Sequence, residues 1–355
     1  MPTIVVRNRG KKLPVLMGRN WLEKLRLDWS VVGQVTADYR VEEMRKKFPD
    51  VFDSSSGLIK EFQAKIIVKD SNTPVFCKAR SVPFAVRNAV TEQLDELEKT
   101  GIVKHVAQSE WATPLVVVPK KNGEGLRLCG DFKVTINPVL QTEHYSLLHP
   151  EEHFSVLAGG SVFCVLDLSS AYHQIEVARE CRQLLTVNTH QGLYQFQRLP
   201  FGISSAPAIF QSLMDKVLKD IPQVGCYIDD VIIAGKDIED CSKLLETVLK
   251  MLNKYNIEIR ESNCRIFQDS EVYVGHKITP KGIYPTDRKI KATIQAPDPT
   301  NVTELKAYIG MLNFYARFLK NLSTVAAPLY ELLKKGKNGY GIGDAEELLK
   351  RRKNC

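Results

Sequence analysis

The sequence predicts an α+β fold in which an antiparallel sheet packs against helices. Two apolar, β-branched runs at 224–228 and 231–234 flank a short turn, which is typical of a β-hairpin. A third apolar run at 162–166 has the length of a strand, and apolar side chains recur at helical spacing between 238 and 256. We expect the third run to lie beside the hairpin in one sheet, and the helix to pack through its apolar face.

Carboxylates stand where these predicted strands end. Asp229 and Asp230 form the tip of the hairpin, and Asp167 follows the strand at 162–166. In one sheet the three carboxylates converge, and they repel one another unless a cation or solvent offsets their charge. Such oxygen ligands suit Mg²⁺, and two ions about 3.5 to 4 Å apart can hold the attacking and leaving oxygens of a phosphoryl transfer. The alternative is that these residues have only structural roles. Asp pairs are common in turns, and Asp167 would merely end a strand at the surface.

A second hairpin is predicted upstream of the acidic residues. Its strands cover 115–118 and 126–128, with Asn122-Gly123 near the turn, a pair that strongly favours a hairpin. It carries three basic side chains, Lys120, Lys121 and Arg127. Arginine offers a planar fork for phosphate oxygens and lysine a mobile point charge, so this hairpin suits a triphosphate. A solvated, charged turn is the alternative.

Two more helices are predicted on either side of these strands. The first covers about 88–100, with Val90, Leu94 and Leu97 on one face and Gly101 as its stop. The second begins at Asn301, which forms a pattern like a capping box with Glu304. Its large apolar residues recur at steps of four, three and four, at Tyr308, Leu312, Tyr315 and Leu319. We expect this stripe to be core rather than a nucleic-acid contact.

The order and spacing of several sequence blocks resemble the reverse transcriptase of gypsy-type LTR retrotransposons. The central blocks include Leu166-Asp167, Tyr172-His173, Leu199-Pro200-Phe201-Gly202 and Tyr227-Ile228-Asp229-Asp230. Further blocks lie at 111–114, 120–123, 127–133, 274–276 and 301–333, so the similarity covers roughly residues 13 to 335. The resemblance implies a right-hand polymerase with fingers, palm and thumb that copies RNA or DNA into DNA. Its implied partners are a template with a primer, and dNTPs.

The resemblance also implies roles for particular residues. Asp167, Asp229 and Asp230 are the expected catalytic and metal-binding residues. Asp167 and Asp229 bind two Mg²⁺ ions, with Mn²⁺ as the alternative ion, and Asp230 completes the acidic cluster. The dNTP-binding residues are Lys121, Arg127, Tyr172 and Phe201. The tyrosine packs beneath the incoming sugar, where its bulk excludes a ribose 2′-hydroxyl. The alternative for both aromatic residues is ordinary packing, in the core and beneath a turn respectively.

One position departs from the family pattern. Related enzymes commonly have a lysine before the cysteine that corresponds to Cys264, and that lysine is a proton donor to the leaving pyrophosphate. Asn263 stands there in this chain, and an amide has no acidic proton to give at neutral pH. We therefore expect slower extension than in relatives that carry the lysine.

The resemblance divides the chain into five segments. Residues 1–29 resemble the C-terminal end of a retropepsin-like protease without its Asp-Thr/Ser-Gly loop, so we expect no protease activity. A connector at 30–85 precedes the fingers and palm at 86–279, a helical thumb segment at 280–335 and a divergent tail at 336–355. Neither a ribonuclease H nor an integrase domain fits in the tail, so we expect a piece of a retroelement polyprotein.

Composition agrees with this interpretation and is less specific. The chain has 49 basic and 41 acidic residues, and the resulting net charge of +8 suits a polyanionic partner. Its 8 cysteines form no Cys-x-x-Cys pair, which argues against a structural zinc site and a disulfide framework. A reducing compartment is therefore expected. No apolar run approaches the ~18 residues that span a bilayer. We expect no membrane partner and a cytoplasmic location, with the nucleus as the alternative.

One metal-binding pattern is treated as accidental. His149 and His153 match the His-x-x-Glu-His spacing of inverted zinc peptidases. Pro150 disfavours the continuous helix that would present both histidines on one face.

Two functions of different classes remain open from the sequence alone. The first is an RNA-directed DNA polymerase, which the complete set of acidic and dNTP-binding residues favours. The second is a catalytically inactive remnant that still binds nucleic acid, which Asn263 and the divergent ends favour. Binding affinity cannot separate them, because contacts to the phosphate backbone persist in both cases.

Overall fold

A computed structural model gives the structure of most of the chain. It describes residues 39–53, 57–69, 73–119, 125–141, 145, 150–297, 299, 301–318 and 321–333. Several predictions lie outside these residues: the protease-like segment at 1–29, Lys120, Lys121, the Asn122-Gly123 turn, His149, Leu319 and the tail at 336–355.

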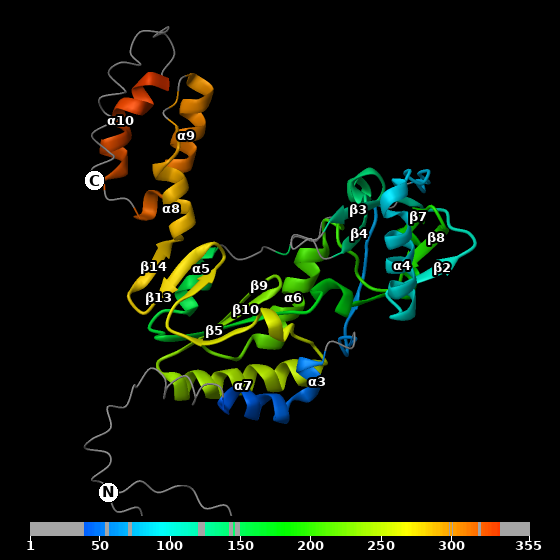
Figure 1. The fold of residues 1–355 in the computed structure, drawn as a ribbon, viewed down its shortest axis with the longest axis horizontal. Helices are drawn as coiled ribbons and strands as arrows, with labels where there is room; N and C mark the ends of the chain where they lie inside the picture. Colours follow the sequence, from blue (N-terminus) through cyan, green and yellow to red (C-terminus); the bar gives the residue numbers. More distant parts are fainter. Residues whose placement is uncertain are drawn as a thin grey trace, which may run out of the picture.

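A four-stranded antiparallel sheet forms the centre of the molecule (Figure 1). Its strands, in the order β11-β5-β10-β9, are Arg265–Gln268, Val162–Asp167, Asp230–Gly235 and Val224–Tyr227. The predicted hairpin and its neighbouring strand are therefore confirmed. The register places Asp230 opposite Asp167, so the acidic ends of β5 and β10 meet at one edge of the sheet.

Each face of this palm sheet is covered by a different layer. Cys164, Leu166, Val231 and Ile233 pack on the side of α6, Ala206–Leu218, and α7, Ile238–Tyr255. The alternate residues Phe163, Val165, Ile232 and Ala234 pack with α5, Pro150–Val156, and with strands β12 and β13, Glu271–Tyr273 and His276–Thr279. The strands are thus apolar on both faces, as the unbroken apolar runs in the sequence require. Pro150 is the first residue of α5, so that helix begins within the zinc-peptidase-like pattern.

The long helix behind the sheet follows its sequence pattern closely. The Asp237 side chain accepts a hydrogen bond from the Asp240 N–H at 2.8 Å and caps the start of α7. Asn256 ends the helix in the left-handed conformation. The apolar face predicted for this helix is buried at Leu245, Val248, Leu249 and Leu252.

Residues 39–66 contribute directly to the core. A helix at 39–47 and the short α3, Pro49–Phe52, lie along α7 in Figure 1. The segment buries Met44, Phe48, Val51, Ile59 and Ile66 in the main hydrophobic cluster. Part of the predicted connector is therefore packed against the palm. The burial of these apolar residues is hard to predict from the sequence, because they lie in short elements and turns and follow no single period.

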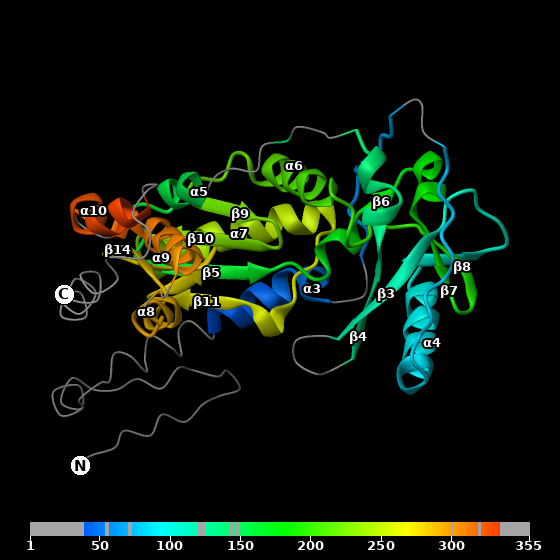
Figure 2. The same ribbon diagram turned by 90° about the horizontal axis from the view of Figure 1, so that it is seen from above.

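A second sheet forms the predicted fingers, at one end of the molecule (Figure 2). Its strands, in the order β2-β8-β7-β3-β4, are Val103–Val106, Gly192–Phe196, Thr186–Thr189, Thr113–Pro119 and Leu126–Gly130. The predicted upstream hairpin corresponds to the antiparallel pair β3 and β4. The first predicted helix is α4, Phe84–Lys99, which begins after Pro83 and so extends four residues beyond the expected start. Val90 and Leu94 are buried on its inner face.

The remaining elements are short. A two-stranded parallel pair consists of β1, Gln63–Ala64, and β6, Glu176–Val177. The 3₁₀ helices η1 to η6 are Phe132–Val134, Asn137–Val139, Ala171–Gln174, Arg179–Leu185, Glu261–Asn263 and Ala316–Phe318.

The thumb helices stand away from the palm at the other end of the molecule (Figures 1 and 2). They are α8, Asp287–Ile294, α9, Val302–Phe314, and α10, Leu322–Leu333, and they follow β14, Gly282–Pro285. The Asn301 side chain accepts from the Glu304 N–H at 2.9 Å, which confirms the predicted cap of α9. Leu312 is buried and Tyr308 packs against the same cluster, so the core interpretation of the stripe is confirmed for these two residues.

None of the helices in the described ranges is long and apolar enough to cross a membrane.

Candidate active site

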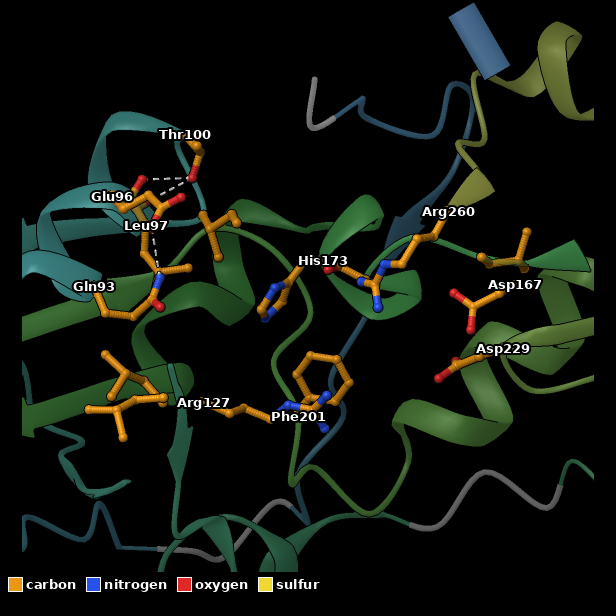
Figure 3. A pocket seen from close by; sticks show the side chains of 15 residues that line it. Gln93, Glu96, Leu97, Thr100, Arg127, Asp167, His173, Phe201, Asp229 and Arg260 are labelled. Carbon is orange, nitrogen blue, oxygen red and sulfur yellow. Dashed lines mark hydrogen bonds between the residues drawn. The ribbon is translucent and has the colours of Figure 1, made fainter. Parts of the chain in front are cut away.

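A cavity of about 490 Å³ lies between the fingers and the palm (Figure 3). The fingers side comes mainly from α4 and β4, and the palm side from the end of β5, the turn before β10 and the residues that follow α7. Charged residues of both signs line it: Glu96, Arg127, Asp167, Asp229 and Arg260. His173 and Phe201 lie between the two sides, as the close view shows.

The turn that carries Asp229 is held by a buried glutamine from α6. Ile228 has a φ of +53°, which a β-branched residue rarely adopts. The Gln211 side chain accepts from the Ile228 N–H at 2.9 Å and donates to the Cys226 carbonyl at 2.8 Å. The Asp229 carbonyl in turn accepts from the Leu168 N–H at 2.9 Å. These hydrogen bonds fix Asp229 beside the end of β5. The sequence analysis did not predict this role for Gln211.

The environment of the acidic residues disfavours their charged forms. Burial, and then the charges of Asp230 and Asp167, raise the pKa of Asp229 to about 6. Partial desolvation at the turn and the Asp167 charge also raise the pKa of Asp230, although this side chain keeps more contact with solvent than Asp229. The Asp229 Oδ1 atom is buried and has no hydrogen-bond partner in the described part of the chain. A buried, unsatisfied carboxylate oxygen beside further negative charge fits a divalent cation, which would remove both penalties.

The described residues do not enclose such an ion by themselves. Among them, no group of three or more His, Cys, Asp or Glu side chains is arranged to hold a metal. Asp167 and Asp229 line the cavity, whereas Asp230 is exposed and is not part of the lining. Mg²⁺ commonly binds through one or two carboxylates and takes its other ligands from substrate phosphates and water. Asp167 and Asp229 are thus the residues that would hold it.

The predicted aromatic residues form one cluster at the cavity. Tyr172 is 8% exposed, and its ring centroid lies 5.1 Å from that of Phe201 and 5.8 Å from that of Phe210. Phe201 lines the cavity, and the Arg127 guanidinium lies 5.0 Å from its ring centroid. Burial and the Asp229 charge raise the pKa of Tyr172, so its hydroxyl stays neutral. Tyr172 therefore supports the Phe201 wall from behind.

Gly202 allows a close approach next to this wall. Its φ is +99°, and a Cβ atom at this position would lie 2.9 Å from the Gly130 carbonyl oxygen. The Asn137 side chain donates to the Gly202 carbonyl at 2.9 Å and accepts from the Ser204 N–H at 3.0 Å. The glycine after Phe201 thus has a structural cause.

Two residues that the sequence analysis did not single out also line the cavity. His173 is placed on η3, and its Nε2 atom is buried with no hydrogen-bond partner among the described residues. Burial, with the nearby Arg198 and Arg127 charges, lowers the pKa of His173 to about 4, so the ring is neutral at pH 7. Arg260 follows the bridge between Ile259 and Leu168. Neither residue had a signal in the sequence, because each depends on contacts between distant segments.

Asn263 lies beside the acidic cluster. Its Nδ2 atom is 3.4 Å from the Asp167 Oδ2 atom. The position where the family resemblance implies a lysine is thus adjacent to a carboxylate of the cavity, and the amide brings no charge to it.

The arrangement matches known proteins at the level of family, sequence and fold. Residues 118–278 match the family described as reverse transcriptase (RNA-dependent DNA polymerase). The chain is 33% identical over 294 residues to the retrovirus-related Pol polyprotein from transposon opus of Drosophila melanogaster, which covers 81% of this chain. It is 31% identical over 277 residues, or 76% of its length, to the Pol polyprotein from transposon gypsy of the same organism. It spans 29% and 26% of these two relatives.

A solved structure shares the fold. The foamy viral protease-reverse transcriptase dRH in complex with double-stranded DNA matches with a TM-score of 0.78 and 18% identity, covering 98% of this chain and 62% of the other. Fold and site therefore define a right-hand polymerase of the reverse transcriptase family. Within that family the chain belongs with the reverse transcriptase regions of gypsy-type and related LTR retrotransposon polyproteins. The resemblance seen in the sequence is confirmed.

Proposed function

We propose that the protein is an RNA-directed DNA polymerase that adds deoxynucleotides to a primer 3′-hydroxyl. One observation carries the proposal. Asp167 and Asp229 meet on the palm side of a cavity whose fingers side presents Arg127. Acidic residues on one side and a cation on the other suit phosphoryl transfer, which depends on positioning and charge stabilisation more than on covalent chemistry by the protein.

In this proposal, one set of residues binds the metal ions and another binds the nucleotide. Two bound Mg²⁺ ions, or Mn²⁺ as the alternative, would supply positive charge between the primer oxygen and the phosphate. Asp167 and Asp229 would hold them, and Asp230 would add negative charge beside them. Arg127 would leave the Phe201 ring and bind triphosphate oxygens through its planar fork, together with Lys121. Tyr172 does not line the cavity itself, so it would act through the Phe201 ring that it supports, and this wall would leave no room for a ribose 2′-hydroxyl.

The partners follow from the same proposal. They are an RNA or DNA template with a primer, and dNTPs; we propose no membrane partner. We also propose a cytoplasmic location, with the nucleus as the alternative. The described cysteines are all free thiols, which supports a reducing compartment.

Primer extension on poly(rA)/oligo(dT) with dTTP and Mg²⁺ tests the proposal. The control is the Asp229→Asn, Asp230→Asn double variant. Extension by the parent alone would support it. If neither protein extends the primer while both bind the duplex, the chain is an inactive remnant that binds nucleic acid.

A further inference from the structure

Arg260 is fixed at the edge of the acidic cluster by its backbone. Its N–H donates to the Asp167 carbonyl at 2.7 Å, and the preceding Ile259 forms a bridge with Leu168. The chain that follows α7 therefore runs beside the end of β5. Any side chain at position 260 starts within reach of Asp167 and Asp229.

The Arg260 side chain points into the cavity and is not neutralised. Figure 3 shows its guanidinium directed into the space that Asp167, Asp229 and His173 surround. Within the described residues it forms no ion pair and no side-chain hydrogen bond. The adjacent Glu261 is bonded to Arg45 instead. Arg265, the next arginine along the chain, is 2.6 Å from Glu271.

Arg260 is one of two arginines that face the acidic residues. Arg260 and Arg127 both line the cavity that Asp167 and Asp229 line. These two arginines come from opposite sides of the cavity, Arg127 from β4 and Arg260 from the palm. A chain of phosphates would offer oxygens to both arginines at once.

We propose that Arg260 is a phosphate-binding residue that contacts the terminal phosphates of the incoming dNTP and the pyrophosphate that leaves. The inference rests on the proposed function and extends it to a residue outside the predicted site. Arg260 acts by charge and hydrogen bonding alone, since a guanidinium does not give up its proton. Arg260 lies three residues before Asn263. It therefore supplies a positive charge to a segment whose residue 263 is an uncharged amide.

The test compares Arg260→Gln with Arg260→Lys and with the control Arg265→Gln. Arg265 is the same residue type on the next strand, but it is paired with Glu271 and does not line the cavity. Binding of dTTP is measured on a template–primer whose 3′ end is a dideoxynucleotide, so that no turnover is required. Inhibition of extension by pyrophosphate and the Kd for the template–primer alone complete the set, and thermal unfolding checks that each variant folds.

We expect Arg260→Gln to weaken dTTP binding and pyrophosphate inhibition about tenfold, the effect of losing one charge-assisted hydrogen bond. Arg260→Lys should recover part of the loss. Arg265→Gln should bind dTTP within about twofold of the parent, because Arg265 does not line the cavity. Unchanged dTTP binding in Arg260→Gln, or an equal loss in Arg265→Gln, would overturn the inference. A loss confined to the template–primer Kd would also overturn it, since the guanidinium would then bind a backbone phosphate.

The two proposals fail in different ways. A parent that binds dTTP on the blocked primer but never extends a free primer would contradict the proposed function and leave the Arg260 comparison intact. A parent that extends normally, with Arg260→Gln indistinguishable from it in dTTP binding, would contradict only the inference.

Discussion

At the scale of single residues, the active site depends on Asp229, a half-buried carboxylate whose surroundings disfavour its charged form. The turn that positions Asp229 requires a positive φ at Ile228, and Gln211 satisfies the polar groups of that turn. Burial and neighbouring carboxylates then raise the pKa of Asp229 to about 6. The strained backbone at Ile228 and the disfavoured charge of Asp229 both oppose folding. A cation bound at the site would interact favourably with the carboxylate that they position.

The raised pKa of Asp229 makes a prediction about stability. Because the folded pKa lies above the ordinary value of 3.8, the ionised side chain destabilises the metal-free protein, fully above about pH 6 and not at all below about pH 3.8. Asp229→Asn should therefore raise the free energy of unfolding by about 1–2 kcal/mol at pH 7.5, a value reduced from the full shift for partial exposure. Denaturant unfolding in metal-free buffer at pH 7.5 and pH 4 measures it. A variant no more stable than the parent at pH 7.5 would contradict the account.

Gln211 offers a second test at this scale. Replacing it by leucine keeps the volume but leaves the Ile228 N–H and the Cys226 carbonyl without their partner. We expect a loss of about 2 kcal/mol in unfolding free energy and at least a tenfold fall in kcat for extension. Gln108→Leu, at an exposed position in the fingers, is the control. Equal stability and equal rates in the two variants would show that Gln211 does not position Asp229.

Asn263 offers a third test. A lysine at this position would bring its ammonium group beside the Asp167 carboxylate, which the amide now approaches to 3.4 Å. The charge would favour ionised carboxylates, and the ammonium could give a proton to pyrophosphate. We expect Asn263→Lys to raise the single-turnover rate of extension, and Asn263→Gln, which adds length without charge, to leave it unchanged. An unchanged rate in the lysine variant would remove this explanation.

At the scale of elements, the turn after Phe201 connects the fingers to the palm. A Cβ atom at Gly202 would meet the Gly130 carbonyl at the end of β4, the strand that carries Arg127, and Phe201 packs against that arginine. A displacement of this turn would therefore move the Phe201 wall and the β4 strand together.

Gly202→Ala tests the close packing of this turn. The added Cβ would meet the Gly130 carbonyl at 2.9 Å in addition to the strain of a φ of +99°. Gly101→Ala is a matched control, because Gly101 has a φ of +68° with no atom within 4 Å of the added Cβ. We expect a loss of about 1 kcal/mol for the control and 2 to 3 kcal/mol for Gly202→Ala, with a higher KM for dTTP in the latter alone. Equal effects of the two substitutions on unfolding and KM would rule out the close contact as the cause.

At the scale of the whole molecule, the parts differ in how far the sequence determines them. The palm strands and α7 follow from their apolar periodicity, and Asp167 and Asp229 follow from their places at the ends of those strands. The contribution of residues 39–66 to the core was not predicted, because its apolar residues have no single period. Arg260 and Gln211 could not be found from the sequence, since only the fold brings them to the acidic turn. Nor could the sequence show that Asp230 stays outside the cavity lining while Asp229, one residue earlier, is part of it.

The most direct test of the account is single-nucleotide incorporation on an RNA template by three separate variants, Asp167→Asn, Asp229→Asn and Asp230→Asn. The two cavity-lining carboxylates hold the metal ions in this account, so their variants should lose about a thousandfold or more in incorporation rate while still binding template–primer. Asp230→Asn should lose clearly less, because this side chain is exposed and outside the cavity lining. Near-parental incorporation by Asp167→Asn or Asp229→Asn would contradict the claim that these two residues form the catalytic site.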